Sequence, residues 1–195
     1  SAMDQALERN AEVAVISSGG RMLQIAKEKG LNAVALPGGN PPRSMMGYSI
    51  SCLMAYLEFY GLNVPAWRPA WEEAVRDMNE QKERYHKEAE EHARTLHGKT
   101  IAVYATDGLA AMGERMRQQF NENSKMLGWS AAIPEMNHNE LVGWAGGDQR
   151  MAVLVLRHSG EFERNAVRAE INKETLKHYT PHLLEWRSDC SHPIA

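Results

Sequence analysis

Residues 151–156 read MAVLVL, a continuous apolar run in a chain of 195 residues of which 24% are charged. A strand with one face in water alternates apolar and polar side chains, whereas a strand covered on both faces is apolar throughout. Such fully covered strands are typical of parallel sheets enclosed by helices. The run therefore predicts an inner strand of a parallel sheet and indicates an α/β fold.

Helix-like and strand-like segments alternate around this run. Strands are predicted at 12–17, 33–36, 100–105, 129–133 and 182–186, and helices at 21–29, 44–60, 71–96, 109–127 and 161–178. Strands separated by helices form βαβ units, whose strands are parallel. Ligands of open parallel sheets bind beyond the carboxyl ends of the strands. A ligand site is therefore expected in the loops that follow 33–36, 100–105 and 129–133. In the second of these loops, Asp107 and Gly108 predict a turn and a helix N-cap.

Composition excludes several classes of function. The formal net charge is −3, so nothing draws the chain to nucleic acid or to anionic lipid. No apolar run approaches the roughly 18 residues of a membrane-spanning helix, and the start SAMDQALERN lacks the features of a signal peptide. Cys52 and Cys190 are the only cysteines and neither belongs to a metal-like or redox-like pair, which indicates a reducing compartment. We predict a soluble, cytoplasmic protein.

A rigid loop with one arginine follows the predicted strand 33–36. Residues 37–43 read PGGNPPR, and their prolines and glycines exclude regular secondary structure. A guanidinium fixed between a strand and a helix can clamp a phosphate or stabilise a developing oxyanion. In the alternative interpretation, Arg43 donates hydrogen bonds to nearby backbone carbonyls and has only a structural role.

A cluster of polar side chains follows the predicted strand 129–133. Residues 134–141 read PEMNHNEL and contain two amides, an imidazole and two carboxylates. His138 and Asn139 are suited to orient a hydroxyl-rich ligand, and a shielded carboxylate such as Glu140 makes a good general base. His138 and Glu140 do not predict a metal site, because zinc requires further ligands. The alternative interpretation is a capped turn in which an asparagine of this motif begins the next helix.

Other conspicuous residues are expected to be structural. Residues 121–125, NENSK, form a polar cluster that can face a ligand or a second subunit, but a polar helix end is the favoured interpretation. Trp144 and Trp186 are predicted to pack in the core or at an interface. The histidines His86, His92, His97 and His178 lie among charged residues and are predicted to be ordinary surface residues.

Three long stretches carry a resemblance to a known family. They are residues 17–49, SSGGRMLQIAKEKGLNAVALPGGNPPRSMMGYS, residues 117–144, RQQFNENSKMLGWSAAIPEMNHNELVGW, and residues 154–174, LVLRHSGEFERNAVRAEINKE. The first resembles the end of the first sugar-isomerase (SIS) domain of the bifunctional phosphoglucose/phosphomannose isomerase family. The other two resemble that family's second SIS domain. The strings PGGNPPR and PEMNHNEL are the specific ones, and the likeness runs along nearly the whole chain.

The resemblance implies a fold and an assembly. Members of the family consist of two flavodoxin-like SIS domains, each a three-layer αβα sandwich with a mainly parallel sheet. They work as homodimers with the active site at the subunit interface, without a cofactor or a metal. By resemblance, residues 1–61 are the C-terminal part of the first SIS domain, 62–98 are a linker helix, and 99–195 are the second SIS domain without its C-terminal helices.

The resemblance also implies an activity. The family interconverts glucose 6-phosphate or mannose 6-phosphate with fructose 6-phosphate, a reaction of glycolysis and gluconeogenesis, through a cis-enediolate. Glu140 in NHNE falls on the catalytic base, and Arg43 in PPR falls on the arginine that stabilises the enediolate. That charge exists only around the transition state, so stabilising it increases the rate. Pro42, His138 and Asn139 are assigned to substrate binding.

Three parts of the family's active site are expected to be missing or altered. The phosphate-binding loop should precede residue 1, and the ring-opening lysine should lie beyond Ala195. The family's histidine, which is supplied across the dimer, aligns with Phe162. His158, four residues earlier, is a candidate to replace it, with a structural role at the strand end as the alternative. We therefore expect that both ends of the chain are cut and that this piece is inactive by itself.

Two hypotheses from other classes stand beside the isomerase. One is a non-catalytic SIS module that binds a sugar phosphate and senses a metabolite. The other is a scaffold fragment that only dimerises. Retention of both Glu140 and Arg43 favours the enzyme, because a sensor needs no proton-transfer base, whereas Phe162 in place of the histidine favours the sensor.

Overall fold

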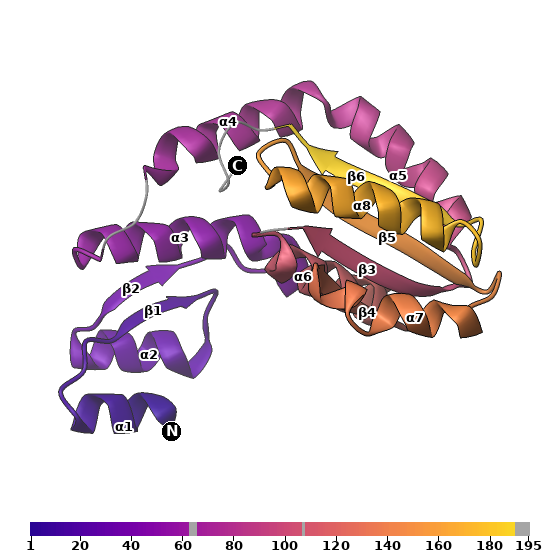
Figure 1. Ribbon diagram of the computed structural model, residues 1–195. Coiled ribbons are helices and arrows are strands. Elements are labelled where there is room, and N and C mark those ends of the chain that lie inside the picture. The colour runs from indigo at the N-terminus through magenta and orange to yellow at the C-terminus, as the bar shows by residue number, and fades with distance from the viewer. Residues whose placement is uncertain (63–65, 107, 190–195) are drawn as a thin grey trace. The chain divides into compact units, whose positions relative to one another are not determined.

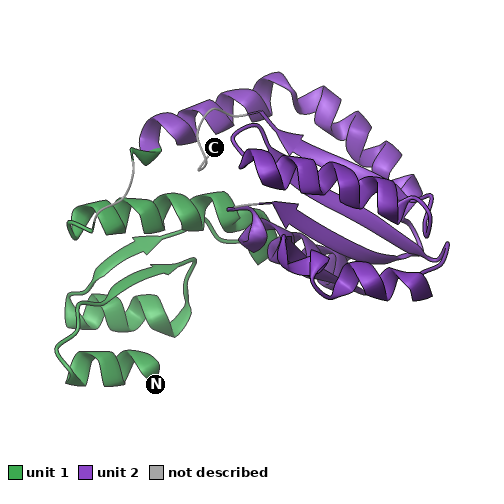
Figure 2. Ribbon diagram, viewed as in Figure 1, with its two compact units in different colours: residues 1–67 green, residues 68–195 purple. Residues whose placement is uncertain are grey.

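The computed structural model describes residues 1–62, 66–106 and 108–189 and divides the chain into two compact units (Figure 2). Unit 1 is Ser1–Trp67 and unit 2 is Arg68–Ala195. Each unit contains one parallel sheet. The boundary between the units falls within helix α4 (Trp67–Glu80), inside the segment 62–98 that the resemblance assigns to a linker. Asp107, predicted as a helix N-cap, lies outside the described residues.

Unit 1 is built around a two-stranded parallel sheet. Its elements are α1 (Ala2–Glu8), β1 (Ala14–Ser17), α2 (Gly20–Lys29), β2 (Asn32–Ala35), the 3-10 helix η1 (Pro42–Met45) and α3 (Met46–Phe59). Helix α2 ends at Gly30, whose φ of 65° suits glycine, so the chain turns back and enters β2 parallel to β1. Helices α1 and α2 lie on one side of the two strands and α3 on the other (Figure 1).

Unit 2 contains a four-stranded parallel sheet with the strand order β4-β3-β5-β6. The strands are β3 (Thr100–Thr106), β4 (Gly128–Ile133), β5 (Met151–His158) and β6 (Leu183–Ser188). Strand β5 pairs with β3 on one side and with β6 on the other, and the side chains from Ala152 to Arg157 are buried. The prediction of an inner strand at 151–156 is therefore confirmed.

Helices cover both faces of this sheet, because alternate side chains of each strand point to opposite faces. One face packs against α5 (Lys82–Leu96) and α6 (Ala110–Gln119) through Ile101, Val103, Ala105, Ala152, Leu154 and Leu156. The other packs against α8 (Glu163–Leu176) and the segment 134–146 through Ala102, Tyr104, Val153 and Val155. In Figure 1, α8 lies in front of the sheet and α5 behind it. The three-layer αβα arrangement is thus confirmed.

Three local predictions were wrong. The helix predicted at 71–96 consists of α4 and α5, which Gln81 separates with φ −99° and ψ 6°. The helix predicted at 109–127 ends as a π-helical turn at Phe120–Ser124, and Lys125 closes it in the left-handed conformation. His92 is not an ordinary surface residue, because its Nδ1 accepts a hydrogen bond of 2.7 Å from Nε1 of Trp186 and the two rings stack.

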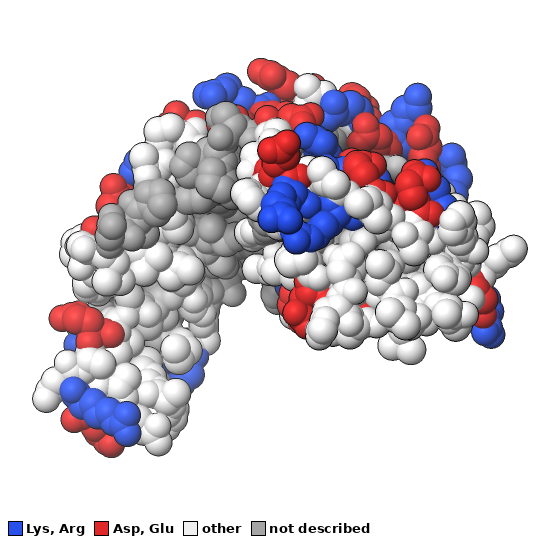
Figure 3. Space-filling model, in the orientation of Figure 1, with Lys and Arg blue, Asp and Glu red and all other residues white. Residues whose placement is uncertain are grey.

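The surface of unit 2 carries intermixed charges. In Figure 3, both signs gather over α5 and α8, while the surface over α7 (Glu140–Gly143) is mainly uncharged. On α5, Glu90 pairs with Arg94 at 3.6 Å, and Arg84 pairs with Glu88 at the same distance. Such exposed pairs indicate a solvated face. Among the described residues, the helices are too short or too polar to cross a membrane.

Candidate active site

The motif 134–141 begins a segment that runs from the end of β4 across one face of the sheet. The segment contains the 3-10 helix η3 (Glu135–Asn137), α7 and the 3-10 helix η4 (Trp144–Gly146). Met136 and Trp144 are buried at its two ends. Because both anchors are fixed in the core, Glu140 is held between them over the sheet.

The asparagines of the motif have structural partners. Oδ1 of Asn139 accepts a hydrogen bond of 2.6 Å from the backbone N–H of Glu140 and caps α7, and its Nδ2 donates to Glu135. Asn137 and Asn172 of α8 exchange amide hydrogen bonds in both directions. The capped turn is therefore confirmed. His138 and Asn139 are exposed, and their contact with a ligand stays a prediction.

The carboxylate of Glu140 is half-buried and hydrogen-bonded. Its Oε2 accepts hydrogen bonds from the Tyr104 hydroxyl at 3.0 Å and from Nε1 of Trp129 at 2.7 Å. The side chain also lines a pocket of about 270 Å³. The other lining residues are Trp129, Gly143, Trp144, Gly146, Gly147 and Met151. Glu140 is thus sheltered in the way that a general base requires, within a volume close to that of small-molecule sites.

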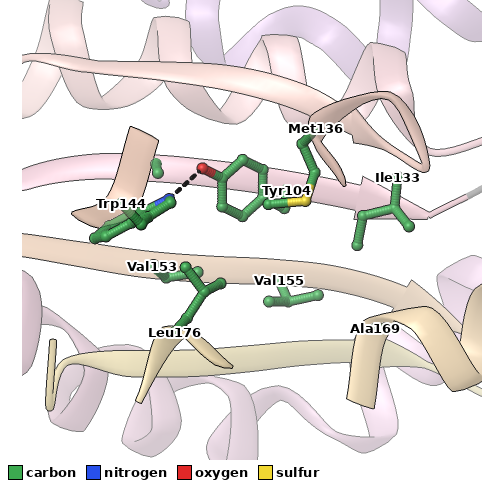
Figure 4. Close-up of a cluster of buried hydrophobic side chains, with 9 residues drawn as sticks. Tyr104, Ile133, Met136, Trp144, Val153, Val155, Ala169 and Leu176 are labelled. Carbon is green, nitrogen blue, oxygen red and sulfur yellow. Dashed lines mark hydrogen bonds between the residues drawn. The ribbon is translucent and has the colours of Figure 1, made fainter. Parts of the chain in front are cut away.

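Tyr104 and Trp144 form the floor behind this carboxylate. Their side chains are 1% and 3% exposed, and Nε1 of Trp144 donates to the Tyr104 hydroxyl at 2.8 Å (Figure 4). Burial is the main reason that the pKa of Tyr104 is raised, so the hydroxyl keeps its proton and can donate it to Glu140. Trp144 was predicted to pack in the core and does so, but its hydrogen bond and the contacts of Tyr104 and Trp129 were missed.

Arg43 lies in the first turn of η1 in unit 1. Pro42 begins η1, and both the backbone N–H and the hydroxyl of Ser44 donate to the carbonyl of Pro41. Arg43 is exposed, and no ion pair or hydrogen bond of its guanidinium is found within the described ranges 1–62, 66–106 and 108–189. The proposed bonds to nearby carbonyls are therefore not seen there. Arg43 belongs to unit 1 and Glu140 to unit 2, and each is placed only within its own unit.

A charged network that the sequence did not indicate lies at the carboxyl end of β5. Arg157 is 4% exposed, and its Nε donates to Glu161 at 2.9 Å. Its Nη1 contacts Glu170 of α8 and Glu185 of β6, and Lys173 bonds to both of these carboxylates. The bond from Lys173, followed by that from Arg157, lowers the pKa of Glu170. The network fixes the loop after β5 to α8 and β6.

The residue aligned with the family's histidine lies near this network. Phe162 precedes the first residue of α8 and is 61% exposed, and His158 is the last residue of β5. Over the part of the chain that the structure describes, no group of three or more His, Cys, Asp or Glu side chains is arranged to hold a metal.

Comparison with known proteins identifies the family. The sequence model described as the bacterial phospho-glucose isomerase C-terminal SIS domain matches residues 85–195, which is more than half of the chain. The chain belongs to this family. Its SIS domain contains all four strands of the sheet in unit 2 together with Glu140, Tyr104, Trp129 and Trp144.

Relatives of this SIS protein extend the likeness into unit 1. The bifunctional phosphoglucose/phosphomannose isomerase of Aquifex aeolicus is 29% identical over 90% of this chain and 53% of its own length. The protein of the same name from Caldicellulosiruptor bescii is 29% identical over 91% of this chain and 55% of its own. The chain thus spans about half the length of these relatives.

A solved structure shares the fold at low sequence identity. The C-terminal domain of glucosamine-fructose-6-phosphate aminotransferase from Francisella tularensis superposes with a TM-score of 0.63 at 13% identity. The match covers 93% of this chain and 64% of that one. It supports the architecture of the chain and carries no statement about its substrate.

Proposed function

We propose that the protein to which this chain belongs is an aldose–ketose isomerase of hexose 6-phosphates, which interconverts glucose 6-phosphate, mannose 6-phosphate or both with fructose 6-phosphate. The observation that carries the proposal is the carboxylate of Glu140, half-buried and hydrogen-bonded beside a pocket in the SIS domain. Membership of the isomerase family supports the reaction class.

The reaction moves one proton between neighbouring carbons. A carboxylate oxygen of Glu140 takes the proton from C2 of the open-chain aldose. The C–H electron pair then forms the C1–C2 double bond, and the carbonyl electrons move to the C1 oxygen as an enediolate. Glu140 returns the proton to C1, and the hydroxyl proton passes from O2 to O1, which leaves the ketone at C2. A general base of this kind contributes about 10²–10⁴-fold to the rate.

The remaining assignments follow the family resemblance. Arg43 stabilises the enediolate oxygen by its positive charge, and its exposed guanidinium is available for this role. Pro42, His138 and Asn139 contact the substrate. The protein works in the cytoplasm as a homodimer whose active site lies at the subunit interface, without a cofactor.

The second candidate is a non-catalytic SIS module that binds a sugar phosphate and senses it. Phe162 favours this candidate. It occupies the position that aligns with the family's histidine, and its exposed phenyl ring cannot transfer a proton. Glu140 argues against it, because binding alone does not require a sheltered carboxylate next to a pocket.

Turnover of fructose 6-phosphate by the full-length protein tests the proposal. Glu140→Gln keeps the shape of the side chain but removes the base, so we expect kcat to fall at least about 100-fold. The matched control is Glu174→Gln, which removes an exposed carboxylate from α8 and should leave kcat within about twofold. Full turnover by Glu140→Gln would eliminate this base. Binding of fructose 6-phosphate without turnover by the wild-type protein would favour the sensor.

A further inference from the structure

The hydrogen bonds around Glu140 have a fixed direction. An indole N–H can only donate, so the bond between Trp144 and Tyr104 runs from the indole to the phenol oxygen. The single hydrogen of the Tyr104 hydroxyl is then free to be donated to a carboxylate, which only accepts while it is ionised. Trp129 likewise can only donate to that carboxylate. Every hydrogen bond of this group is therefore donated toward Glu140, and its direction cannot be reversed.

Both donors reach the same oxygen. Within the described residues, the hydrogen bonds to the Glu140 side chain end on Oε2, and Oε1 accepts none. Two donors occupy the two lone pairs of Oε2. Oε1 is consequently the oxygen whose lone pairs are available to a substrate, and the same side chain lines the pocket.

Rigid elements hold these donors in place. Tyr104 lies in β3, Trp129 in β4 and Trp144 at the start of η4, and both Tyr104 and Trp144 are buried. A Cβ atom at Gly147 would lie 2.7 Å from Cε3 of Trp144, so only glycine leaves room for the indole in its present position. Tyr104 and Trp144 thus have little space in which to exchange partners.

We propose that Tyr104, Trp129 and Trp144 are positioning residues that lock Oε2 of Glu140 and leave Oε1 as the oxygen that accepts the substrate proton. This inference rests on the proposed function of Glu140 as the base. Trp144 acts through Tyr104, whereas Tyr104 and Trp129 act directly on the carboxylate. A carboxylate fixed at one oxygen keeps the other at a constant distance from the reacting carbon, and small displacements of a base are costly to the rate.

The test compares Tyr104→Phe and Trp129→Phe with a matched control in the full-length protein. Each variant removes one donor and keeps an aromatic ring. We expect kcat for fructose 6-phosphate to fall about 10- to 100-fold in both, with little change in KM. The control is Tyr85→Phe, which removes the hydrogen bond that the Tyr85 hydroxyl on α5 donates to the Asp77 carboxylate on α4.

The outcomes separate this inference from the proposed function. If Glu140→Gln is inactive while Trp129→Phe, whose side chain is only half-buried, keeps the wild-type kcat and KM, the positioning role is overturned and the base remains. If Glu140→Gln retains full turnover, the base itself is eliminated and the positioning role falls with it. Thermal unfolding of each variant identifies loss of the fold, and Trp129→Phe decides the question if Tyr104→Phe does not fold.

Discussion

Unit 2 encloses its parallel strands, whereas in unit 1 one strand is exposed and one helix has no buried residue. In unit 2, core clusters of nine and seven buried side chains cover the two faces of the sheet. In unit 1, the cluster consists of Met3, Val15 and Ala26, the four residues of β2 are exposed, and α3 has no buried residue. Both units share the same βαβ construction, so the difference lies in how much apolar surface each one covers.

The unequal burial indicates that most of the stability of the chain resides in unit 2. Burial of apolar surface is the main favourable term in folding, and a small core leaves little net stability after the entropy of ordering the chain is subtracted. We therefore expect unit 2 to unfold last. Native-state hydrogen exchange can test the comparison strand by strand, because amides of β3 and β5 should exchange far more slowly than those of β1 and β2.

The largest effect is expected from truncation of a buried leucine. Leu154→Ala in β5 removes a fully buried side chain and should lower the free energy of unfolding by about 2–5 kcal/mol. The matched change in unit 1 is Leu53→Ala on α3, where the side chain is 50% exposed and the cost should be within about 0.5 kcal/mol. Urea unfolding measures both changes. Equal costs would show that α3 is packed as tightly as β5.

Two glycine substitutions should have opposite signs. A Cβ atom at Gly128 of β4 would lie 2.4 Å from the backbone carbonyl oxygen of Ile101, so Gly128→Ala should destabilise unit 2 by about 1–3 kcal/mol. At Gly47 of α3, no atom lies within 4 Å of the added Cβ. Gly47→Ala should therefore stabilise α3 by about 0.4–1 kcal/mol, because alanine restricts the unfolded chain. Hydrogen exchange of the amides next to each substituted glycine distinguishes the two effects. If Gly47→Ala were destabilising as well, the open environment of α3 would be contradicted.

The smallest effect is a dependence of stability on pH. The hydrogen bond from Arg117, followed by that from Ser130, lowers the pKa of Glu114 from 4.5 to about 2. The unfolded chain binds a proton at this site more readily, so the contribution of Glu114 is complete above about pH 4.5 and is lost as the pH falls toward 2. Glu114→Gln should thus be less stable than the wild type at pH 6, and the gap should narrow at acid pH. A gap that does not depend on pH would contradict the interaction with Arg117.

In unit 1, Glu28→Gln provides the comparison. Both side chains of the Arg21–Glu28 pair are exposed, so the pair should contribute little to the free energy of unfolding at pH 7.

The sequence predicted the layers of the fold because they depend on local patterns. The apolar run in β5 and the alternation of elements are sufficient to place the strands of unit 2. The interruption at Gln81 and the π-helical turn at Phe120–Ser124 were missed, because a change of backbone hydrogen bonding leaves no clear trace in the side-chain pattern. The exposure of β2 was not predicted either, because Ala33, Val34 and Ala35 are as apolar as a covered strand.

The candidate site was predictable only in part. The crowding of polar residues in PEMNHNEL identified the segment and Glu140. The partners of Glu140 were not predictable from local sequence, because Tyr104 lies 36 residues away and Trp129 lies 11 residues away along the chain. The only sequence signal was the presence of aromatic residues with polar tips in otherwise apolar strands, because a buried phenol or indole needs a hydrogen-bond partner.

The two indoles beside the pocket should give the protein a characteristic circular dichroism signal in the near ultraviolet. The ring centroids of Trp129 and Trp144 are 6.5 Å apart and their planes are inclined by 36°. Chromophores at such a separation couple their electronic transitions, so the pair should produce a near-ultraviolet exciton signal whose sign depends on their mutual angle. Both indoles line the pocket, so a ligand that occupies it would change their surroundings and with them that signal. Ligand entry can thus be followed spectroscopically without a label.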